Sequence, residues 1–364
     1  MKNTLLISLA ILFLAGCKNN DDQAPPPPPE PTEFIKAADV SFLPEIEQYG
    51  TVYYYSDGTP ADVLAILKAN GCNTIRIRLW YEPETAHSGL AEVAAFAARI
   101  KSAGMKVWLN LHYSDTWADP GKQYTPDDWR SLSYAVLKDS VYAYTKRVLD
   151  IIHPEFVQIG NEVNSGMLWE KGRIDNPSDF TGLLKMGIKA ARDHDPSMKI
   201  IIHFAGLEDS GWFFDLLTTG LVDYDIMALS YYPTWHGKDL QELRNVMADL
   251  VAVHDKEIVI AETAYPFTLG WNDYTNNIIG LEEQLIPGYD ATPEGQAKFL
   301  RDLIQIVRDV EGGVGFCYWS AEWVAFKGST ASDGSPWENQ AFFDFDNKAL
   351  PVLEEYLDPL GIHK

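Results

Sequence analysis

Residues 157–166 read VQIGNEVNSG, and residues 258–266 read IVIAETAYP. In each segment a short apolar run of the β type stops at a glutamate, Glu162 in the first and Glu262 in the second, and a loop begins. A carboxylate at the carboxyl end of a strand points into a shared cleft when the strands belong to one parallel barrel. Enzymes that hydrolyse glycosidic bonds typically use a pair of such carboxylates. Either glutamate alone is more simply a loop residue, so the prediction depends on the rest of the barrel.

The pattern of these two segments repeats along the chain, where short apolar runs alternate with longer stretches of helical periodicity. The eight runs are residues 34–42, 74–80, 106–112, 156–161, 199–204, 225–231, 257–262 and 314–319. Helix-like segments between them include residues 60–70, 90–103, 133–152, 177–193 and 293–310, several with a proline near the first turn. Apolar strands separated by helices indicate a parallel sheet covered on its outer face. Eight such units predict an α/β protein with a single (β/α)8 TIM barrel.

Composition and missing motifs exclude several other classes of function. The rival fold, an open doubly wound sheet, is disfavoured because no glycine-rich phosphate loop follows a strand, and no motif for zinc or for a nucleophilic serine is present. No metal is therefore predicted at the site. With 52 acidic and 29 basic side chains, the formal net charge is −23, which repels nucleic acid and anionic membrane surfaces. The sequence favours a neutral partner, and its 11 Trp and 18 Tyr suit stacking on sugar faces as well as core packing.

The N-terminal part of the chain has the pattern of an export signal. Lys2 precedes an apolar run that ends in Leu14-Ala15-Gly16-Cys17. This ending resembles the lipobox of bacterial lipoproteins, in which the cysteine becomes lipidated, although an ordinary signal peptide remains the alternative. Residues 18–22, KNNDD, resemble the acidic stretch that routes some lipoproteins to the outer surface of the outer membrane. We therefore expect a signal peptide at 1–17 with lipidation at Cys17, a proline-rich linker at 18–33 and a catalytic domain at 34–364.

Other residues at predicted strand ends are candidates for the same cleft. Arg78 ends the second strand and is expected to hold Glu262 as an anion, with a structural ion pair as the alternative. Tyr231 or Tyr232, at the end of the sixth strand, is expected to donate a hydrogen bond to Glu262, and strand alternation does not decide which. Residues 111–123, LHYSDTWADPGKQ, form a polar and aromatic loop after the third strand that is typical of a binding site.

These motifs together resemble a known family. Asn161-Glu162 at the fourth strand with Glu262 at the seventh resembles the large clan of retaining barrel glycosidases. The loop HYSDTWADPGKQ is similar to the signature of glycoside hydrolase family 53, the endo-β-1,4-galactanases. Further similar segments are KAADVSF, ILKANGCNTIRIRLW, IGNEVNSGMLW, LSYYPTWHG, AETAYPFT, ATPEGQ and NQAFFDF, which span nearly the whole predicted domain.

The resemblance implies an enzyme that cleaves internal β-1,4 bonds of pectic galactan and its galactooligosaccharides with retention of configuration. Glu162 would be the general acid/base and Glu262 the nucleophile. The residues implied to line the cleft are Asn161, Arg78, His112, Asp115, Trp117, Tyr231, Tyr232, Trp235, His236 and Trp319. Two alternatives stay open: another β-glycanase of the clan, such as a mannanase or xylanase, and a non-hydrolytic surface lipoprotein that binds glycans.

No cofactor is required by the family that the chain resembles. Some relatives hold a structural calcium ion in the long loop after the seventh strand, where this chain has Asn272, Asp273, Asn276 and Asn277. Their oxygens are suitable ligands, but their spacing differs from a twelve-residue calcium loop. Contact with a membrane is expected only through the lipid on Cys17.

Overall fold

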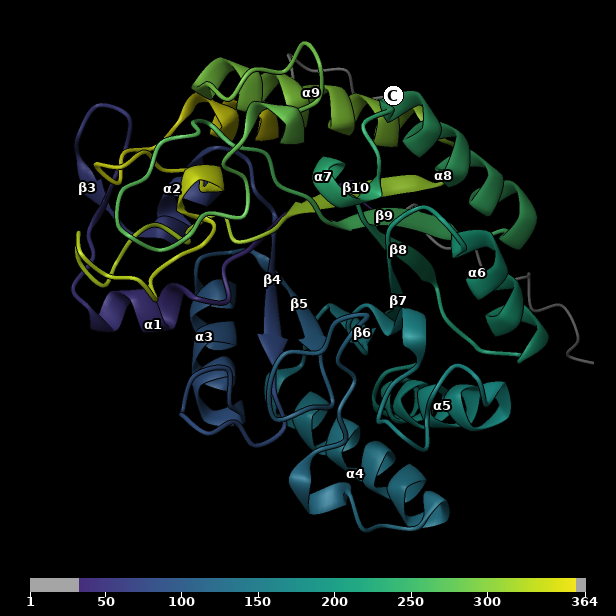
Figure 1. The fold of residues 1–364 in the computed structure, drawn as a ribbon. Helices are drawn as coiled ribbons and strands as arrows, with labels where there is room; N and C mark the ends of the chain where they lie inside the picture. Colours follow the sequence, from purple (N-terminus) through teal and green to yellow (C-terminus); the bar gives the residue numbers. More distant parts are fainter. Residues whose placement is uncertain (1–32, 358–364) are drawn as a thin grey trace, which may run out of the picture. The chain divides into compact units, whose positions relative to one another are not determined.

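The computed structural model describes residues 33–357, so the predicted signal peptide at 1–17 and all but the last residue of the predicted linker lie outside the described residues. Within the described part, eight parallel strands close into a barrel in the order β1-β10-β9-β8-β7-β6-β5-β4. The eight predicted runs form these strands, which confirms the barrel prediction (Figure 1). The strands are β1 Ile35–Asp39, β4 Thr74–Leu79, β5 Lys106–Leu111, β6 Phe156–Ile159, β7 Lys199–Ala205, β8 Ile226–Ser230, β9 Glu257–Glu262 and β10 Gly313–Tyr318.

Helices connect successive strands and pack around the outside of the barrel (Figure 1). They are α1 Leu43–Gln48, α2 Val63–Ala69, α3 Leu90–Ser102, α4 Tyr134–Ile152, α5 Pro177–His194, α6 Ser210–Thr219, α7 Pro233–His236, α8 Leu240–His254 and α9 Pro293–Asp309. Side-chain caps fix several starts: Ser133 accepts from Val136 N, and Thr292 accepts from Gly295 N at 3.0 Å. Pro177 and Pro293 occupy the first helical turn, where a missing N–H costs nothing.

The first predicted helix starts later than expected. Residues 60–61 form β3 (Pro60–Ala61), which pairs with β2 (Tyr53–Tyr54) in a small antiparallel sheet. Helix α2 begins only at Val63, because Asp62 caps it by accepting a 2.7 Å hydrogen bond from Leu64 N. Behind the helix, Gly71 has φ of 94°, and a side chain there would meet Tyr356 O at 2.7 Å. Glycine is therefore required at this helix end for conformation and for space.

Two apolar layers hold the barrel together. One lies between the strands and the surrounding helices and is built mostly from the outward-facing strand residues and the inner faces of the helices. The other is a smaller cluster of buried residues contributed by the strands themselves: Ile35, Ala37, Trp108, Phe156, Ile201, Ile226, Ala228, Val259, Ala261, Val314 and Cys317. Because strand residues alternate between faces, this second set fills the barrel interior, as expected for side chains that point inward from parallel strands.

Further along the same strands the buried side chains become polar. Trp108 is followed two residues later by Asn110 on β5, Phe156 by Gln158 on β6, and Ile201 by His203 on β7. A period of two places each polar residue on the inner face, one step closer to the carboxyl end of its strand. The functional cleft is therefore expected at the carboxyl end of the barrel, next to the apolar cluster that fills its interior.

A register shift directs Glu262 to that cleft. Along β8 and β9 the pairs are Leu229 with Ile260 and Ser230 with Glu262, so Ala261 is an extra residue on β9. Simple alternation would place Glu262 on the opposite face from Val259 and Ala261, both of which belong to the inner cluster. The bulge turns the glutamate inward, in keeping with the tendency of bulges to re-aim side chains beside active sites.

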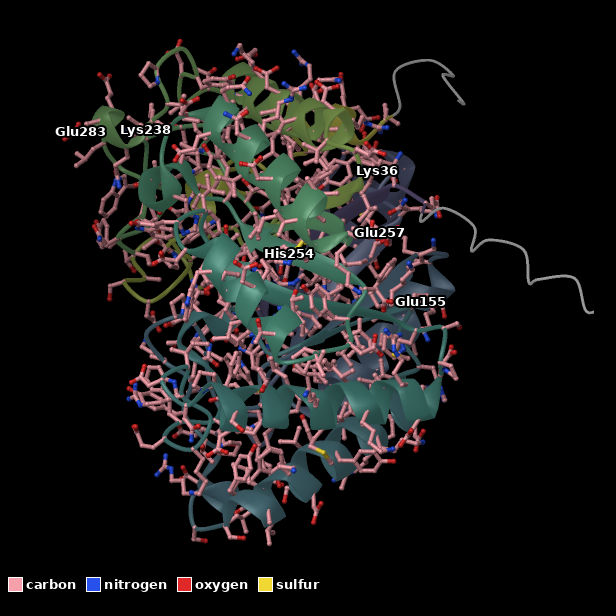
Figure 2. All side chains as sticks on the ribbon, turned by 90° about the vertical axis from the view of Figure 1, so that its right-hand side faces the viewer. Lys36, Glu155, Lys238, His254, Glu257 and Glu283 are labelled. Atoms are coloured by element: carbon pink, nitrogen blue, oxygen red, sulfur yellow. The ribbon has the colours of Figure 1, made fainter. Side chains whose placement is uncertain are left out.

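The two ends of the barrel carry different residues. Figure 2 shows Lys36, Glu155 and Glu257 at the amino ends of their strands, far from Lys238 and Glu283, which lie among the loops at the other end. Ion pairs such as Lys199 with Glu257, at 3.1 Å, are among the charged groups at the amino end. Among residues 33–357, no helix combines the length and the apolar character that crossing a bilayer requires.

Candidate active site

Glu162 lies three residues after the end of β6, at the N-cap position of the 3-10 turn η2 (Val163–Ser165). Its backbone is left-handed, with φ of 45°, and Gly160 two residues earlier has φ of 82°. A side chain at Gly160 would meet Val163 Cγ1 at 2.5 Å, so the turn requires glycine. Left-handed backbone at a non-glycine residue is unfavourable and persists where the surrounding structure imposes it, often at active sites. This turn brings Glu162 to the wall of a cleft.

Glu262 ends β9 and is held by two donors. Arg76 on β4 donates from Nη2 to Oε1 at 2.9 Å, and the hydroxyl of Tyr232 donates to Oε2 at 3.0 Å. All three side chains are buried. A guanidinium and a phenol that both donate to a carboxylate favour its ionised form. Tyr232, not Tyr231, is thus the tyrosine that meets Glu262, which settles the choice that the sequence left open.

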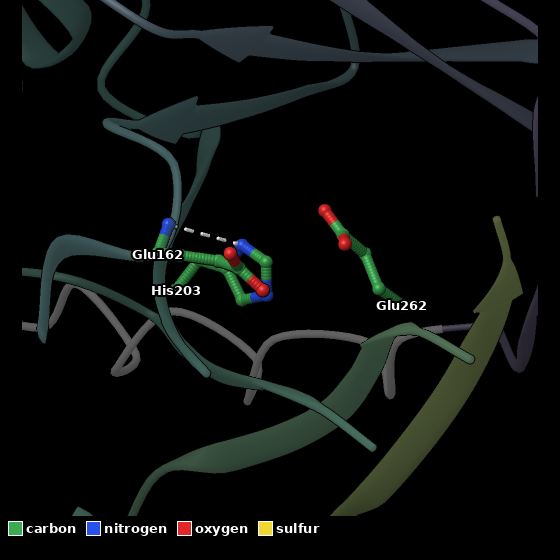
Figure 3. Close-up of side chains that lie close together, drawn as sticks. All are labelled: Glu162, His203 and Glu262. Carbon is green, nitrogen blue, oxygen red and sulfur yellow. Dashed lines mark hydrogen bonds between the residues drawn. The ribbon is translucent and has the colours of Figure 1, made fainter. Parts of the chain in front are cut away.

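The two glutamates are close enough to act on one bond. One carboxylate oxygen of Glu162 and one of Glu262 lie within 4.8 Å of each other, and both also lie within that distance of a His203 nitrogen. Figure 3 shows the two carboxyl groups reaching the same space from different strands, with the His203 ring beside Glu162. Retaining glycosidases place their carboxyl groups about 5 Å apart, whereas inverting enzymes need about 6.5–9.5 Å to admit a water.

The surroundings of the two carboxyls favour different protonation states. Burial, followed by the negative charge of Glu262, raises the pKa of Glu162 to about 8. Burial also raises the pKa of Glu262, but the positive charge of Arg76 opposes that rise and the Tyr232 hydrogen bond lowers it further. Because two carboxylates this close do not both ionise readily, the pair keeps one proton at neutral pH. The donors around Glu262 leave that proton on Glu162.

A hydrogen-bond chain supports Glu162 from behind. His203 Nδ1 faces two donors, the backbone N–H of Glu162 at 3.4 Å and Gln158 Nε2 at 3.0 Å. It also lies 3.2 Å from Asn161 Oδ1, but that oxygen already accepts from Arg76, Asn110 and Gln158, so Nδ1 is the acceptor. Nε2 therefore carries the proton and donates to Ser230 Oγ at 2.9 Å. Ser230 in turn donates to Glu162 Oε1 at 2.6 Å. Burial keeps the pKa of His203 well below its usual value, which keeps the ring neutral.

Glu162, His203 and Glu262 form a group that has the residue types of a metal site. The tautomer of His203 tests that interpretation. Nδ1 already accepts from two donors and Nε2 is protonated, so neither ring nitrogen offers a free lone pair toward the cleft. With Arg76 also bound to Glu262, the group fits a proton-sharing carboxylate pair better than a cation.

Asn161 links the strands around the two glutamates. Its Oδ1 accepts from Arg76 Nη2 and from Asn110 Nδ2, each at 2.9 Å, and its Nδ2 donates to Ala118 O at 2.9 Å. Arg76 therefore contacts both the residue beside Glu162 and Glu262 itself. These contacts fix the side chain of Asn161 at the edge of the cleft.

The cleft has a volume of about 470 Å³, which is in the range of small-ligand sites. It contains both glutamates and most of the residues predicted to line it: Asn161, Arg78, His112, Trp117, Tyr232, Trp235, His236 and Trp319. Trp235 is 55% exposed, so its ring is available at the cleft edge. His112 is a buried, neutral ring because burial lowers its pKa well below the usual value.

Arg78 lies in the cleft but does not have the predicted partner. Arg76, two residues earlier on the same inner face of β4, forms the ion pair with Glu262 at 2.9 Å. The guanidinium of Arg78 instead stacks on Phe42 at 4.0 Å and on Trp117 at 4.4 Å, and donates to Ser88 Oγ. Position at the strand end favours Arg78, whereas the long side chain of Arg76, one inward step deeper, is the one that reaches Glu262.

Two other predicted residues do not line the cleft. Asp115 accepts hydrogen bonds from the backbone of Glu82 and Asp127 and thereby ties its own loop to its neighbours. Asp119, in the same loop, lines the cleft in its place. The buried hydroxyl of Tyr231 donates to Gly237 O and points away from the cleft, as strand alternation requires once Tyr232 faces it.

Several lining or supporting residues were not predicted. They are Asp39, Arg76, Asn110, Asp119, His203, Ser230, Trp323 and Trp337. A signal for some of them was present, because a polar residue at an inward position of an apolar strand must find a partner or a function. Arg76 in TIRIRL and His203 in KIIIHFA are examples.

A second group of buried acidic and amide side chains lies where the loop after β9, with Asp273 and Asn277, meets Glu338 from the segment after β10. Asp273, Asn277 and Glu338 are buried, and Asp273 Oδ2, Asn277 Oδ1 and Glu338 Oε2 each have no hydrogen-bond partner among the described residues. Of the other predicted calcium ligands, Asn276 is exposed and the backbone N–H of Asn272 donates to Glu338. Burial, followed by the charge of Asp273, raises the pKa of Glu338.

Comparison with known proteins places these features in context. Residues 35–356 match the family model of glycosyl hydrolase family 53. An arabinogalactan endo-beta-1,4-galactanase of Cellvibrio japonicus is 35% identical, over 97% of this chain and 96% of that protein. The catalytic domain of a family 53 protein of Ignisphaera aggregans superposes with a TM-score of 0.85 at 40% identity, covering 90% and 96% of the two chains. A fungal beta-1,4-galactanase superposes at 0.77 and 31% identity, covering 88% and 98%.

Proposed function

This chain belongs to glycosyl hydrolase family 53, and from that premise we propose that it hydrolyses internal β-1,4-galactosidic bonds of pectic galactan with retention of configuration. The substrate class is that of the related galactanases, which match this chain along most of its length. The enzyme is an O-glycosyl hydrolase whose chemistry requires no cofactor, because its own carboxyl groups supply the proton and the nucleophile.

The observation that carries the mechanism is the separation of Glu162 and Glu262, whose nearest oxygens lie within 4.8 Å. At this distance a sugar C1 fits between them, but an additional attacking water does not. Glu262 attacks the anomeric carbon as an anion, and Glu162 donates its proton to the departing glycosidic oxygen. In the second step Glu162 removes a proton from the water that releases the covalent intermediate.

The neighbouring side chains prepare these two roles. Arg76 and Tyr232 keep Glu262 ionised and aimed until it attacks. Asn161 is supported on both sides and donates to the 2-hydroxyl of the reacting sugar, a contact that strengthens at the transition state. Trp319 and Trp235 offer aromatic faces on which sugar rings stack.

The net negative charge and the aromatic cleft suit a neutral polysaccharide. Mannanase or xylanase activity is less well supported, because the relatives at 30–35% identity are galactanases. A purely binding role is also less well supported, since both carboxyls keep the spacing and the surroundings that catalysis needs.

Reducing-end release from linear β-1,4-galactan, mannan, xylan and glucan tests the proposed substrate. We expect release from galactan, with medium-length oligosaccharides as the first products because the enzyme cuts internally. Activity on mannan or xylan without galactan would overturn the substrate assignment, and galactose alone from the start would overturn the internal mode of cutting.

A structural calcium ion in the loop after β9 is a second part of the proposal. Asp273 Oδ2 and Glu338 Oε2 are buried carboxyl oxygens without a hydrogen-bond partner among the described residues, and Asn277 Oδ1 is a buried amide oxygen in the same position. Buried like charges are costly without a cation, and hard oxygen ligands are those that calcium prefers. A melting scan before and after chelation tests it. The variant Asp273→Asn should have a lower melting temperature than the natural protein, and chelation should change that temperature little. An unchanged midpoint in the natural protein would rule out a stabilising ion.

The chain is also proposed to be a lipoprotein anchored through Cys17 at the outer surface of the bacterial outer membrane. The support is the sequence alone: an apolar signal ending in Leu14-Ala15-Gly16-Cys17, an acidic stretch, and a proline run that serves as a stiff spacer. Replacing Cys17 by serine should release the protein from the membrane fraction. Added protease should remove the natural protein from intact cells, and full protection would contradict surface exposure.

A further inference from the structure

Asp39, at the carboxyl end of β1, is a buried acid that the mechanism above does not use. Its Oδ2 accepts from Arg76 Nη1 at 2.8 Å. Its Oδ1 accepts from both the backbone N–H and the hydroxyl of Ser41, at 3.0 and 2.6 Å. Asp39 and Arg76 are also neighbours in the register between β1 and β4, so backbone pairing and side-chain contacts agree. The carboxylate is thus fixed in one orientation, with one oxygen directed at the arginine.

Arg76 consequently serves two carboxylates at once. Nη1 is bound to Asp39, whereas Nη2 is bound to Glu262 at 2.9 Å and to Asn161. Nε donates to Gln158 Oε1 at 3.2 Å, which completes the set of partners around the guanidinium. In a buried site the positive charge of Arg76 acts strongly on both acids, and the negative charge of Asp39 opposes that effect at Glu262. The two carboxylates therefore share one counter-ion.

Other charged and titratable groups surround this unit from each packed element. Those that act on Asp39 or Glu262 are Arg76 and Arg78 on β4, Cys317 on β10, Glu322 after β10, Tyr232 after β8 and Glu162 after β6. Among them, Arg76 is the one bound directly to both Asp39 and Glu262. Removing the charge of Asp39 therefore acts on Glu262 chiefly through this arginine and through direct repulsion.

We propose that Asp39 is a positioning residue for the retaining reaction, which orients Arg76 and, through its own negative charge, keeps Glu262 nucleophilic. This inference rests on the proposed function of Glu262. Without the negative charge of Asp39 nearby, the Glu262 anion would be more stable and therefore a weaker nucleophile. The negative charge of Asp39 acts in the opposite direction and raises the pKa of Glu262, so the carboxylate is anionic but not overly stabilised.

The replacement Asp39→Asn tests the inference because it predicts the direction of a pH shift. Loss of the charge lowers the pKa of Glu262, so the acidic limb of kcat/KM on galactan moves to lower pH by about one unit. At the pH optimum, kcat falls by about tenfold or more, since the nucleophile is weaker and Arg76 is held less firmly. If Asp39 only held Arg76 in place, the arginine would move away, Glu262 would lose its counter-ion, and the limb would move to higher pH. A limb that stays in place or moves up overturns the inference.

Glu322→Gln is the matched control. Glu322 faces Asp39 from the loop after β10 and is fully buried, and burial raises its pKa to about 8. Below that pH it is protonated, and glutamine preserves its contact with the backbone N–H of Phe42. The acidic limb should therefore stay where it is in this variant. A shift equal to that of Asp39→Asn would mean that any change in this buried region moves the limb.

Titration of the Glu262 carboxyl carbon by NMR, assigned with Glu262→Gln, separates failure of this inference from failure of the proposed function. It measures the pKa of Glu262 without any substrate. If galactan is not hydrolysed by the natural protein, the proposed function fails, and the titration still shows whether Asp39→Asn lowers the pKa. Arg76 keeps three other acceptors, so Asp39→Asn and Asp39→Ser should both fold. If Asp39→Asn and Asp39→Ser both failed to fold, Asp39 would be needed for the fold itself, which contradicts the proposed role of its charge in positioning Arg76 and tuning Glu262.

Discussion

The hydroxyl of Ser230 donates a 2.6 Å hydrogen bond to Oε1 of Glu162. Because His203 Nε2 donates to the same hydroxyl, the serine proton has to point toward the glutamate. Oε1 is then an acceptor, and the proton of the neutral carboxyl resides on Oε2. The hydrogen bonds from His203 to Ser230 and from Ser230 to Glu162 thus determine which carboxyl oxygen of Glu162 carries the proton that the substrate receives.

Replacing Ser230 by alanine tests this role. Since the serine hydrogen bond lowers the pKa of Glu162, its loss raises that pKa further, and the basic limb of kcat/KM moves to higher pH. We expect activity at the optimum to fall by about tenfold, a part of the roughly 10²–10⁴-fold that a positioned general acid supplies. The pH profile of galactan hydrolysis measures both effects. A limb that moves to lower pH would show that the serine does not donate to Glu162.

The proton-sharing pair makes a separate prediction about pH. Glu162 must be protonated to act as an acid, so activity is present below its pKa and is lost as pH rises through about 8. The charge of Glu262 is one cause of that high value, so Glu262→Gln should lower the pKa of Glu162 toward, though not to, its ordinary range. NMR titration of Glu162 in the two proteins measures the change. An equal pKa in both would mean that the two carboxyls are not coupled.

The two arginines of β4 provide a matched pair of variants. Arg76→Lys loses the forked guanidinium that binds Asp39 through Nη1 and Glu262 through Nη2, and we expect kcat to fall by about 10²–10³-fold. Arg78→Lys leaves Glu262 untouched and weakens the stack on Phe42 and Trp117 and the hydrogen bond to Ser88. The effect of that variant should appear mainly in KM. If Arg78→Lys lowered kcat and Arg76→Lys changed mainly KM, Arg78 and not Arg76 would be the functional partner of Glu262.

The roles of the two glutamates are separable by chemical rescue. Glu162→Ala should hydrolyse substrates with good leaving groups better than galactan, because such groups need little protonation. Added azide should rescue it and give a product of retained configuration, whereas azide with Glu262→Ala should give inversion. Product anomers are read by NMR. Full activity on galactan in either alanine variant would refute the assignment.

Much of the barrel and of the catalytic pair was predictable because both follow from local pattern. The apolar runs that end at Glu162 and Glu262 have strand periodicity, and a carboxyl-terminal position on a barrel strand defines the functional face. The aromatic loop containing Trp117 was identified for the same reason. Residues 60–61 do not join the helix, because Pro60 precedes the helix cap at Asp62 and is not a first-turn proline.

The remaining features depend on contacts between strands, which one-dimensional pattern does not encode. The bulge at Ala261 turns Glu262 inward, against simple alternation. Arg76 reaches Glu262 although Arg78 lies nearer the strand end, because the guanidinium of Arg78 is held by Phe42, Trp117 and Ser88 instead. The Asp39 and Ser230 contacts likewise join residues that are far apart in sequence. Predicting these contacts requires the register between strands and the position of each residue along the barrel axis, which are known only from the folded structure.

The central claim is most directly tested by the anomeric configuration of the first product released from linear β-1,4-galactan, recorded by NMR before mutarotation. The closeness of Glu162 and Glu262 predicts that the β anomer appears first, because two successive displacements restore the original configuration. Initial appearance of the α anomer would contradict it, since direct attack by water needs carboxyl groups about 6.5–9.5 Å apart.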